Sequence, residues 1–256
     1  MITTEDEQHF HENGWVVPDW RLPADRLLEL RTLGEVALES QPDKRDYLPD
    51  LQHYAPGILS FASADELLDM VQVFTGPDIA VWGTGIFGKP AYDGVATPWH
   101  QDGQYWPLRP LATTTVWLAL DDATIDNGCM RVISGSHRRR KLFDHRTVDA
   151  SKLTLNQELD WRALGFDREQ TIEIEAGQII LFDLYLIHGS HTNATPNQRR
   201  AITIRYMPTT SHFDRELAAR QHREMGVPDL SKRNLYRMRG VDRCGLNELV
   251  EVPVST

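Results

Sequence analysis

Cysteine is scarce in this sequence of 256 residues, which contains only Cys129 and Cys244. Two cysteines cannot build the disulfide framework that small secreted domains use, so we expect the protein to work in the reducing cytoplasm. The N-terminal segment MITTEDEQHFHENGW is acidic and polar, and is therefore unlike a secretory signal peptide.

Long hydrophobic runs and an excess of positive charge are also missing. No stretch approaches 18 consecutive apolar residues, so the sequence predicts no membrane span. The 27 Lys and Arg residues stand against 37 Asp and Glu, which gives a formal net charge of -10. Such a chain has no overall field to attract nucleic acid or an anionic membrane. We therefore expect a small-molecule substrate as the partner, and a monomer or a homodimer.

The sequence has an ordinary globular composition and no break that would mark a second domain. Hydrophobic residues make up 41% and charged residues 25% of the chain, and 256 residues suit one large domain. We expect a helical N-terminal part at about 1–76 and a core of short strands at about 79–208. The extension 209–256 is expected to be helical to about residue 225 and irregular beyond it.

This order of elements predicts a fold that is mainly β with flanking helices. Helices followed by many short antiparallel strands favour a double-stranded β-helix, the jelly roll, whose core is buttressed by the N-terminal helices. Residues 141–168 interrupt the strands with an irregular excursion, which is expected to act as a lid or substrate loop.

The tripeptide His-Gln-Asp at residues 100–102 is the first candidate for chemistry. Pro98 favours extended backbone before it, and residues two apart on a strand point to the same face. His100 and Asp102 are therefore expected side by side. A second imidazole from a distant strand would complete the ligand set of non-haem Fe(II) sites, two histidines and one carboxylate. Alone, the motif is weak, and it more often marks a strand-end histidine hydrogen-bonded to an aspartate.

The candidate for the second imidazole is His188, which follows a strongly apolar segment and needs a partner if buried. A metal is one such partner, a core hydrogen bond is another, and His191 is a competing ligand. Eleven residues later, Arg199 and Arg200 open a strand on which only one of them can point inward. An inward arginine needs an anion, such as the far carboxylate of 2-oxoglutarate, with Ser190 assisting. The alternative is that both arginines lie on the surface.

Three further residues are candidates for contact with a substrate. Tyr105 and Trp106 place aromatic rings just beyond the candidate iron-binding strand, as pockets often do. Lys89 could face the same cavity and contact an acidic substrate. It could equally be an edge lysine that protects a strand from aggregation.

Three segments together resemble the phytanoyl-CoA dioxygenase family of Fe(II)/2-oxoglutarate-dependent oxygenases, over about residues 1–210. They are TPWHQDGQYWPLRP, TVWLALDDATIDNGCMRVISGSHR and GQIILFDLYLIHGSHTNATPNQRRAITIRY. The resemblance implies a set of iron ligands: His100, Asp102 and His188. It also implies that Arg199 holds the 2-oxoglutarate carboxylate with help from Ser190, and that Trp117 lies beside this co-substrate.

The implied activity is a dioxygenase that uses Fe(II), 2-oxoglutarate and O2 to hydroxylate an aliphatic C–H bond of a metabolite, releasing succinate and CO2. Related halogenases replace the carboxylate ligand by a small residue, so Asp102 favours hydroxylation here. Two other classes stay open. A non-catalytic jelly-roll protein that binds a metabolite or carbohydrate must treat the spacing of these residues as coincidence. A hydrolytic zinc enzyme with the same ligands leaves Arg199 and Ser190 unexplained.

Overall fold

The protein is described by a computed structural model that covers residues 1–149 and 153–253. Residues 150–152, which fall in the predicted loop at 141–168, and residues 254–256 of the predicted extension lie outside the described residues. Within the described ranges, no helix combines the length and the hydrophobicity needed to cross a lipid bilayer.

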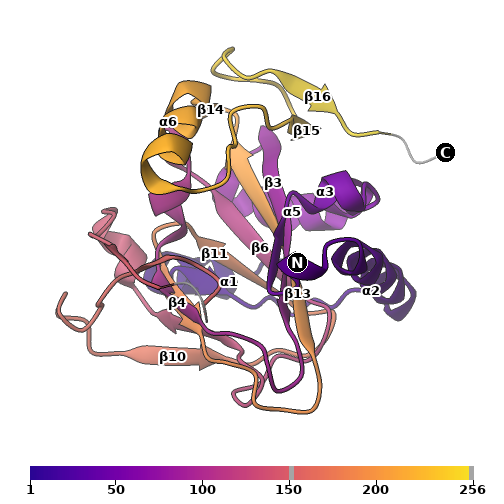
Figure 1. Cartoon of the computed structure of the whole chain (residues 1–256). Coiled ribbons are helices and arrows are strands. Elements are labelled where there is room, and N and C mark those ends of the chain that lie inside the picture. Colours follow the sequence, from indigo (N-terminus) through magenta and orange to yellow (C-terminus); the bar gives the residue numbers. More distant parts are fainter. Residues whose placement is uncertain (150–152, 254–256) are drawn as a thin grey trace.

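Two mainly antiparallel sheets form the centre of the fold (Figure 1). The larger has the strand order β1-β11-β6-β13-β3-β15-β16, with β2 also paired to β3, and the smaller has the order β10-β7-β12-β4. The larger sheet consists of β1 (Trp15–Val16), β2 (Tyr47–Pro49), β3 (Ile79–Lys89), β6 (Thr114–Ala119), β11 (Ile179–Asp183), β13 (Arg199–Pro208), β15 (Leu235–Arg239) and β16 (Leu249–Glu251). The smaller consists of β4 (Thr97–His100), β7 (Met130–Ile133), β10 (Glu169–Ile172) and β12 (Ile187–Ser190). The predicted class, mainly β with a jelly-roll core and flanking helices, is confirmed.

The N-terminal helices cover the larger sheet on the side away from the smaller one, whereas the last helix packs on the opposite face through Ala218. The helices are α1 (Thr4–Asn13), α2 (Ala24–Glu39), α3 (Leu51–Tyr54), α4 (Ile58–Ala62), α5 (Asp65–Thr75) and α6 (Arg215–Met225). The remaining elements are β5 (Leu108–Arg109) paired with β14 (His212–Phe213), β8 (Arg146–Thr147) paired with β9 (Gln157–Glu158), and the 3-10 helices η1 (Pro42–Lys44), η2 (Asp102–Tyr105) and η3 (Ser136–Arg139).

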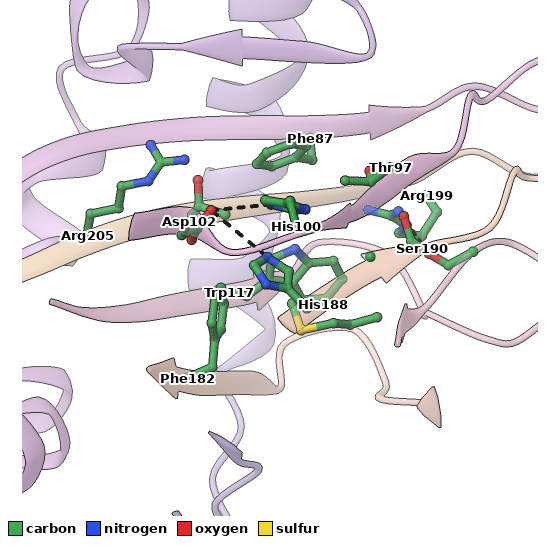
Figure 2. A pocket seen from close by; sticks show the side chains of 14 residues that line it. Phe87, Thr97, His100, Asp102, Trp117, Phe182, His188, Ser190, Arg199 and Arg205 are labelled. Carbon is green, nitrogen blue, oxygen red and sulfur yellow. Dashed lines mark hydrogen bonds and ion pairs between the residues drawn. The ribbon is translucent and has the colours of Figure 1, made fainter. Parts of the chain in front are cut away.

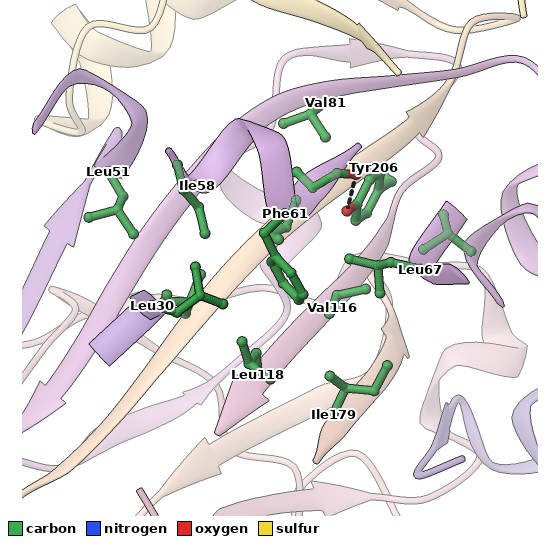
Figure 3. Packing of buried hydrophobic residues seen from close by; sticks show 14 of the residues in the cluster. Leu30, Leu51, Ile58, Phe61, Leu67, Val81, Val116, Leu118, Ile179 and Tyr206 are labelled. Carbon is green, nitrogen blue, oxygen red and sulfur yellow. Dashed lines mark hydrogen bonds between the residues drawn. The ribbon is translucent and has the colours of Figure 1, made fainter. Parts of the chain in front are cut away.

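Alternation along β13 separates the two faces of the larger sheet. Ile202, Ile204 and Tyr206 pack into the cluster formed with helices α2 to α5 (Figure 3). The Tyr206 hydroxyl donates a hydrogen bond to the Ala62 carbonyl oxygen at 2.9 Å, so this buried phenol is satisfied. Thr203 points the opposite way, into a cavity between the sheets. One face of the strand therefore anchors the helices, and the other is free to carry a site.

Local hydrogen bonds bound the first helix at both ends. The Thr3 hydroxyl oxygen accepts from the Asp6 N–H at 3.1 Å, and the Asp6 carboxylate accepts from the Thr3 N–H at 2.9 Å. This reciprocal capping box satisfies two backbone donors that a helix start leaves free. Gly14 ends the helix in the left-handed region, with φ of 86°, and donates to the Phe10 carbonyl oxygen.

The prediction of an irregular chain beyond residue 225 is wrong. Helix α6 agrees with the expected helix, but β15 and β16 follow it and extend the larger sheet. Tyr236 of β15 pairs with Val81 of β3, and Leu249 of β16 pairs with Leu235. Without β15, the strand β3 would leave backbone donors and acceptors unpaired along that part of its edge. The helical N-terminal part likewise contributes two strands, β1 and β2.

Candidate functional site

Three side chains that are far apart in the sequence meet between the two sheets. His100 at the end of β4 and His188 on β12 are register partners on neighbouring antiparallel strands. The His100 Nε2 atom lies 3.4 Å from Asp102 Oδ1, and the His188 Nε2 atom lies 4.0 Å from the same oxygen. One ligand atom from each of the three residues lies within 4.8 Å of the others, which is the spacing of a metal-ligand group. Figure 2 shows the three side chains converging.

Backbone hydrogen bonds fix the orientation of both imidazoles. The His100 Nδ1 atom lies 2.9 Å from the Pro98 carbonyl oxygen, and the His188 Nδ1 atom lies 3.0 Å from the Leu186 carbonyl oxygen. A carbonyl oxygen only accepts, so Nδ1 carries the proton in each ring and Nε2 keeps its lone pair. Metal-binding histidines are commonly held in this way. Both lone pairs are therefore presented to Asp102.

The protonation states also suit a cation. Burial lowers the pKa of His188 to about 4, and the neighbouring His100 adds to that effect. Burial alone would raise the pKa of Asp102. The close contact with His100 and the fields of His188 and Arg205 instead hold this pKa below its ordinary value. At neutral pH the group therefore offers a neutral His188 imidazole and a carboxylate, the forms that bind a metal.

Gln101 holds the turn between the two ligands at the end of β4. Its buried side chain donates to the carbonyl oxygens of Tyr185 at 2.8 Å and Lys141 at 3.0 Å, and accepts from the Phe143 N–H at 2.8 Å. Extended backbone at Gln101 is followed at once by η2, so Asp102 leaves the strand but keeps facing the imidazoles. The sequence interpretation missed this role, because the contacts come from segments 40 and 84 residues away.

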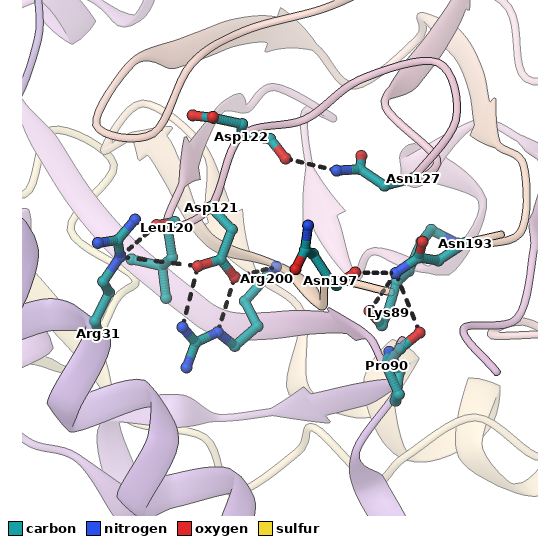
Figure 4. Close-up of polar contacts among 10 residues, drawn as sticks. All are labelled: Arg31, Lys89, Pro90, Leu120, Asp121, Asp122, Asn127, Asn193, Asn197 and Arg200. Atoms are coloured by element: carbon teal, nitrogen blue, oxygen red, sulfur yellow. Dashed lines mark hydrogen bonds and ion pairs between the residues drawn. The ribbon is translucent and has the colours of Figure 1, made fainter. Parts of the chain in front are cut away.

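Arg199 and Arg200 point to opposite faces of the larger sheet. Arg200 forms a bidentate ion pair with Asp121, with contacts of 2.9 and 3.1 Å (Figure 4). Arg199 is 2% exposed, and its side chain lines the cavity beside the candidate metal ligands. Its Nη2 donates to the Gly128 carbonyl oxygen at 2.9 Å, whereas Nε and Nη1 have no partner. Burial lowers the pKa of Arg199 to about 10, so the inward cation is poorly compensated.

Ser190 and Trp117 line the same cavity as Arg199. Ser190 ends β12, two residues after His188, and lies near Arg199 in Figure 2. The Trp117 ring of β6 lies beneath the arginine, with Cζ 5.3 Å from the ring centroid. The structure thus brings together the six residues predicted for iron and co-substrate: His100, Asp102, His188, Arg199, Ser190 and Trp117.

A second, larger cavity of about 400 Å³ lies beside the candidate metal ligands. It shares His100 and Asp102 with the first cavity, and both Tyr105 and Trp106 line it, as the sequence predicts. Arg205 lines both cavities and was missed. Strand parity was the available signal, because Arg205 stands six residues after Arg199 and therefore on the same face.

Lys89 lies outside the lining of both cavities. It stands opposite Arg199 in the β3–β13 register, is 2% exposed, and donates from Nζ to the Val95 carbonyl oxygen. The adjacent loop is fixed by Asn193, which donates to the Lys89 carbonyl oxygen at 3.0 Å (Figure 4). Direct contact with a substrate stays a prediction for Lys89, and this placement does not favour it.

The buried position of Lys89 predicts a pH-dependent stability. Burial, with a contribution from Arg199, lowers the pKa of Lys89 from 10.5 to about 7. Below pH 7 the folded protein therefore bears the full cost of the buried charge, and that cost fades as the pH rises toward 10.5. We expect Lys89→Met to raise the free energy of unfolding most at pH 7, by a few kcal/mol at the most. Urea denaturation of both proteins at pH 7, 8.5 and 10 measures this, and a difference that does not vary with pH would contradict it.

The residues present fit a metal ion and a dicarboxylate. Two histidines and one carboxylate match the donor set of non-haem Fe(II) sites that keep open coordination positions. Two guanidinium nitrogens of Arg199 are buried without a partner, and a carboxylate would satisfy both nitrogens. These features belong to the residues themselves and agree with the sequence interpretation.

Comparison with known proteins gives the same result. The family model described as phytanoyl-CoA dioxygenase (PhyH) matches residues 10–201. The human peroxisomal phytanoyl-CoA dioxygenase is 25% identical over 239 residues, which cover 83% of this chain and 70% of that protein. A probable alpha-ketoglutarate-dependent hypophosphite dioxygenase of Stutzerimonas stutzeri is 28% identical over 155 residues, 60% of this chain and 54% of the relative.

A solved structure extends the likeness to nearly the whole chain. The non-heme monooxygenase ThoJ superposes with a TM-score of 0.73 at 25% identity, covering 97% of this chain and 88% of ThoJ. The matched family range contains His100, Asp102, His188 and Arg199. The predicted resemblance is confirmed: the chain belongs to the phytanoyl-CoA dioxygenase family.

Proposed function

We propose that this protein hydroxylates an aliphatic C–H bond of a small-molecule metabolite, with release of succinate and CO2 from 2-oxoglutarate. The observation that carries the proposal is the convergence of three metal ligands with a buried, partly unpaired Arg199 in one cavity. The phytanoyl-CoA dioxygenase family, to which the chain belongs, consists of Fe(II)- and 2-oxoglutarate-dependent dioxygenases. The protein is therefore an enzyme of this class.

Each side chain has a distinct task in this reaction. When bound, iron and 2-oxoglutarate supply with O2 the oxidising power that breaks a C–H bond. His100, His188 and Asp102 would hold the metal, a ligand set that suits an iron site with room for reactants. Arg199 neutralises the far carboxylate of the co-substrate, with Ser190 donating to the same group. Trp117 closes the wall beneath the arginine and keeps water away from this ion pair.

Anaerobic titration with Fe(II) and 2-oxoglutarate tests the proposal. We expect a weak visible charge-transfer band from the chelate, followed by succinate formation when O2 is admitted. Metal binding without the band would overturn the co-substrate assignment. If neither ligand binds, the protein is a jelly-roll binding protein for a metabolite or carbohydrate, the alternative function.

A cytoplasmic location, as a monomer or homodimer, is part of the proposal. Both cysteines are free, Cys129 buried and Cys244 partly so, as a reducing compartment requires. The named human relative is peroxisomal. Fractionation of the source cells would distinguish the compartments, and light scattering of the purified protein would give the oligomeric state.

A further inference from the structure

The larger cavity has an apolar wall and a charged end. Its wall is built from rings of Tyr47, Trp82, Phe87 and Trp106. Its volume of about 400 Å³ lies in the range of small-molecule sites. The metal ligands His100 and Asp102 form part of its lining, so a molecule held there lies next to the metal position.

Arg205 supplies the charge at that end. The side chain is 6% exposed, and its Cζ stacks 5.7 Å from the Trp82 centroid and 5.5 Å from the Trp106 centroid. Its Nη2 reaches the Tyr47 hydroxyl at 3.3 Å, and its Nε is buried without a partner. Stacking on rings recovers only part of the cost of removing a cation from water.

No carboxylate within the described residues lies at ion-pair distance from Arg205. Two other buried arginines are paired: Arg200 with Asp121, and Arg233 with Asp50 at 2.8 Å. Among the described residues, Arg199 is the buried arginine that shares this lack of a carboxylate partner with Arg205. Asp102 acts on Arg205 only at longer range, and its charge is directed to the metal position. Arg205 is thus a preformed cation that needs an anion from outside the chain.

Figure 2 shows that Arg205 lies apart from Arg199, the cation assigned to the co-substrate. Arg199 and Arg205 lie on opposite sides of the three metal ligands, although both come from the same face of β13. Six residues of strand span roughly 20 Å, too far for one small dicarboxylate to reach both cations. The strand therefore provides two anion sites, one on each side of the metal.

Tyr105 adds a second unsatisfied polar group at this end. Its hydroxyl is buried without a hydrogen-bond partner, and it lines the same cavity as Arg205. Burial, followed by the charge of Asp102, raises the pKa of Tyr105 well above its ordinary value, so the hydroxyl keeps its proton. It remains a donor at any physiological pH.

We propose that the primary substrate is a carboxylic acid with an apolar or aromatic body, whose carboxylate is bound by Arg205 with the Tyr105 hydroxyl as a second donor. The proposal rests on the proposed function and names the substrate class of that site. A planar guanidinium offers paired N–H donors that match a carboxylate. The apolar body lies along the rings of Trp82 and Trp106, which places an aliphatic carbon near the metal.

Matched probes that differ only in charge test this assignment. The protein is loaded with Mn(II), which replaces iron without turnover, and with saturating 2-oxoglutarate, so that Arg199 is already occupied. Dissociation constants are then measured by NMR for phenylacetate, 3-phenylpropionate and indole-3-acetate, and for the three corresponding amides. Faster relaxation of probe protons by Mn(II) shows binding beside the metal.

At least one acid is expected to bind tenfold or more tightly than its amide. The ratio of the amide's dissociation constant to that of the acid should fall to about one in Arg205→Gln. In Arg205→Lys this ratio should stay above one but below the wild-type value. Tyr105→Phe should weaken acid binding several-fold, which provides a readout if the arginine variants do not fold. Arg200→Gln is the matched control, because that arginine lies on the same strand with its side chain on the opposite face.

Equal affinity for acids and amides, or an acid preference that persists in Arg205→Gln, would overturn the proposal. Absence of binding by every acid, while Mn(II) and 2-oxoglutarate still bind, would count against it equally. Failure of Mn(II) or 2-oxoglutarate to bind the wild-type protein would instead refute the proposed function, so the two failures are distinguishable.

Discussion

His188→Ala is expected to abolish metal binding and turnover, whereas His191→Ala is expected to leave both intact. His188 is one of the three proposed ligands, and its Nε2 faces the carboxylate of Asp102 from a buried position. His191 is exposed and its Nδ1 lies 3.2 Å from an Arg131 nitrogen, away from the ligand group. Even the loss of residues behind metal ligands typically costs 10–100-fold in affinity or activity, so loss of a ligand should cost at least ~100-fold.

Thermal unfolding gives a readout that is independent of turnover. A metal at about 100 times its dissociation constant stabilises the folded state by about 2.7 kcal/mol. For a chain of this size that corresponds to a rise in melting temperature of roughly 5–10 °C. We expect this shift in wild type and His191→Ala under anaerobic Fe(II), and none in His188→Ala. A retained shift in His188→Ala, or its loss in His191→Ala, would exchange the roles of the two histidines.

The elements that sequence alone can identify have strong local signals. The capping box at Thr3, the glycine at position 14 and the alternation on β13 each act within a few residues, so no knowledge of the fold is needed. Strand β15 was missed because its sequence, LYRMR, is half polar and becomes a strand only through pairing with β3. Such pairing depends on residues more than 150 positions away, and propensity does not report it.

The candidate site likewise combines residues that sequence patterns predict with residues whose roles depend on the fold. The motif at 100–102 and the spacing from His188 to Arg199 predicted residues that the structure brings together around the first cavity. Gln101 and Arg205 were not identified, because their roles depend on which distant segments surround them. For Lys89 the sequence offered two readings, and neither described a buried lysine bonded to the Val95 carbonyl oxygen, in register with Arg199.

Arg199→Met is expected to weaken 2-oxoglutarate binding strongly without destabilising the protein that lacks ligands. Removing one partner of a buried charge pair typically costs 2–5 kcal/mol, or roughly 30- to 4,000-fold in the dissociation constant. In the free protein, however, two of the guanidinium nitrogens are unpaired, and burial lowers the pKa of Arg199 to about 10. An apolar side chain of similar length removes that unfavourable charge, so the free energy of unfolding should stay equal or rise.

Arg200→Met is the control, because it is expected to lower stability and to leave the affinity for 2-oxoglutarate unchanged. Its loss leaves the carboxylate of Asp121 without the bidentate partner, so this variant should lose stability, by about 1.5–3 kcal/mol. Its affinity for 2-oxoglutarate should be unchanged, because the side chain lies on the other face of β13. Urea denaturation and the anaerobic chelate titration measure the two quantities in each variant. If Arg199→Met instead loses stability and keeps its affinity for 2-oxoglutarate, the buried arginine supports the fold, and the co-substrate carboxylate must be bound elsewhere.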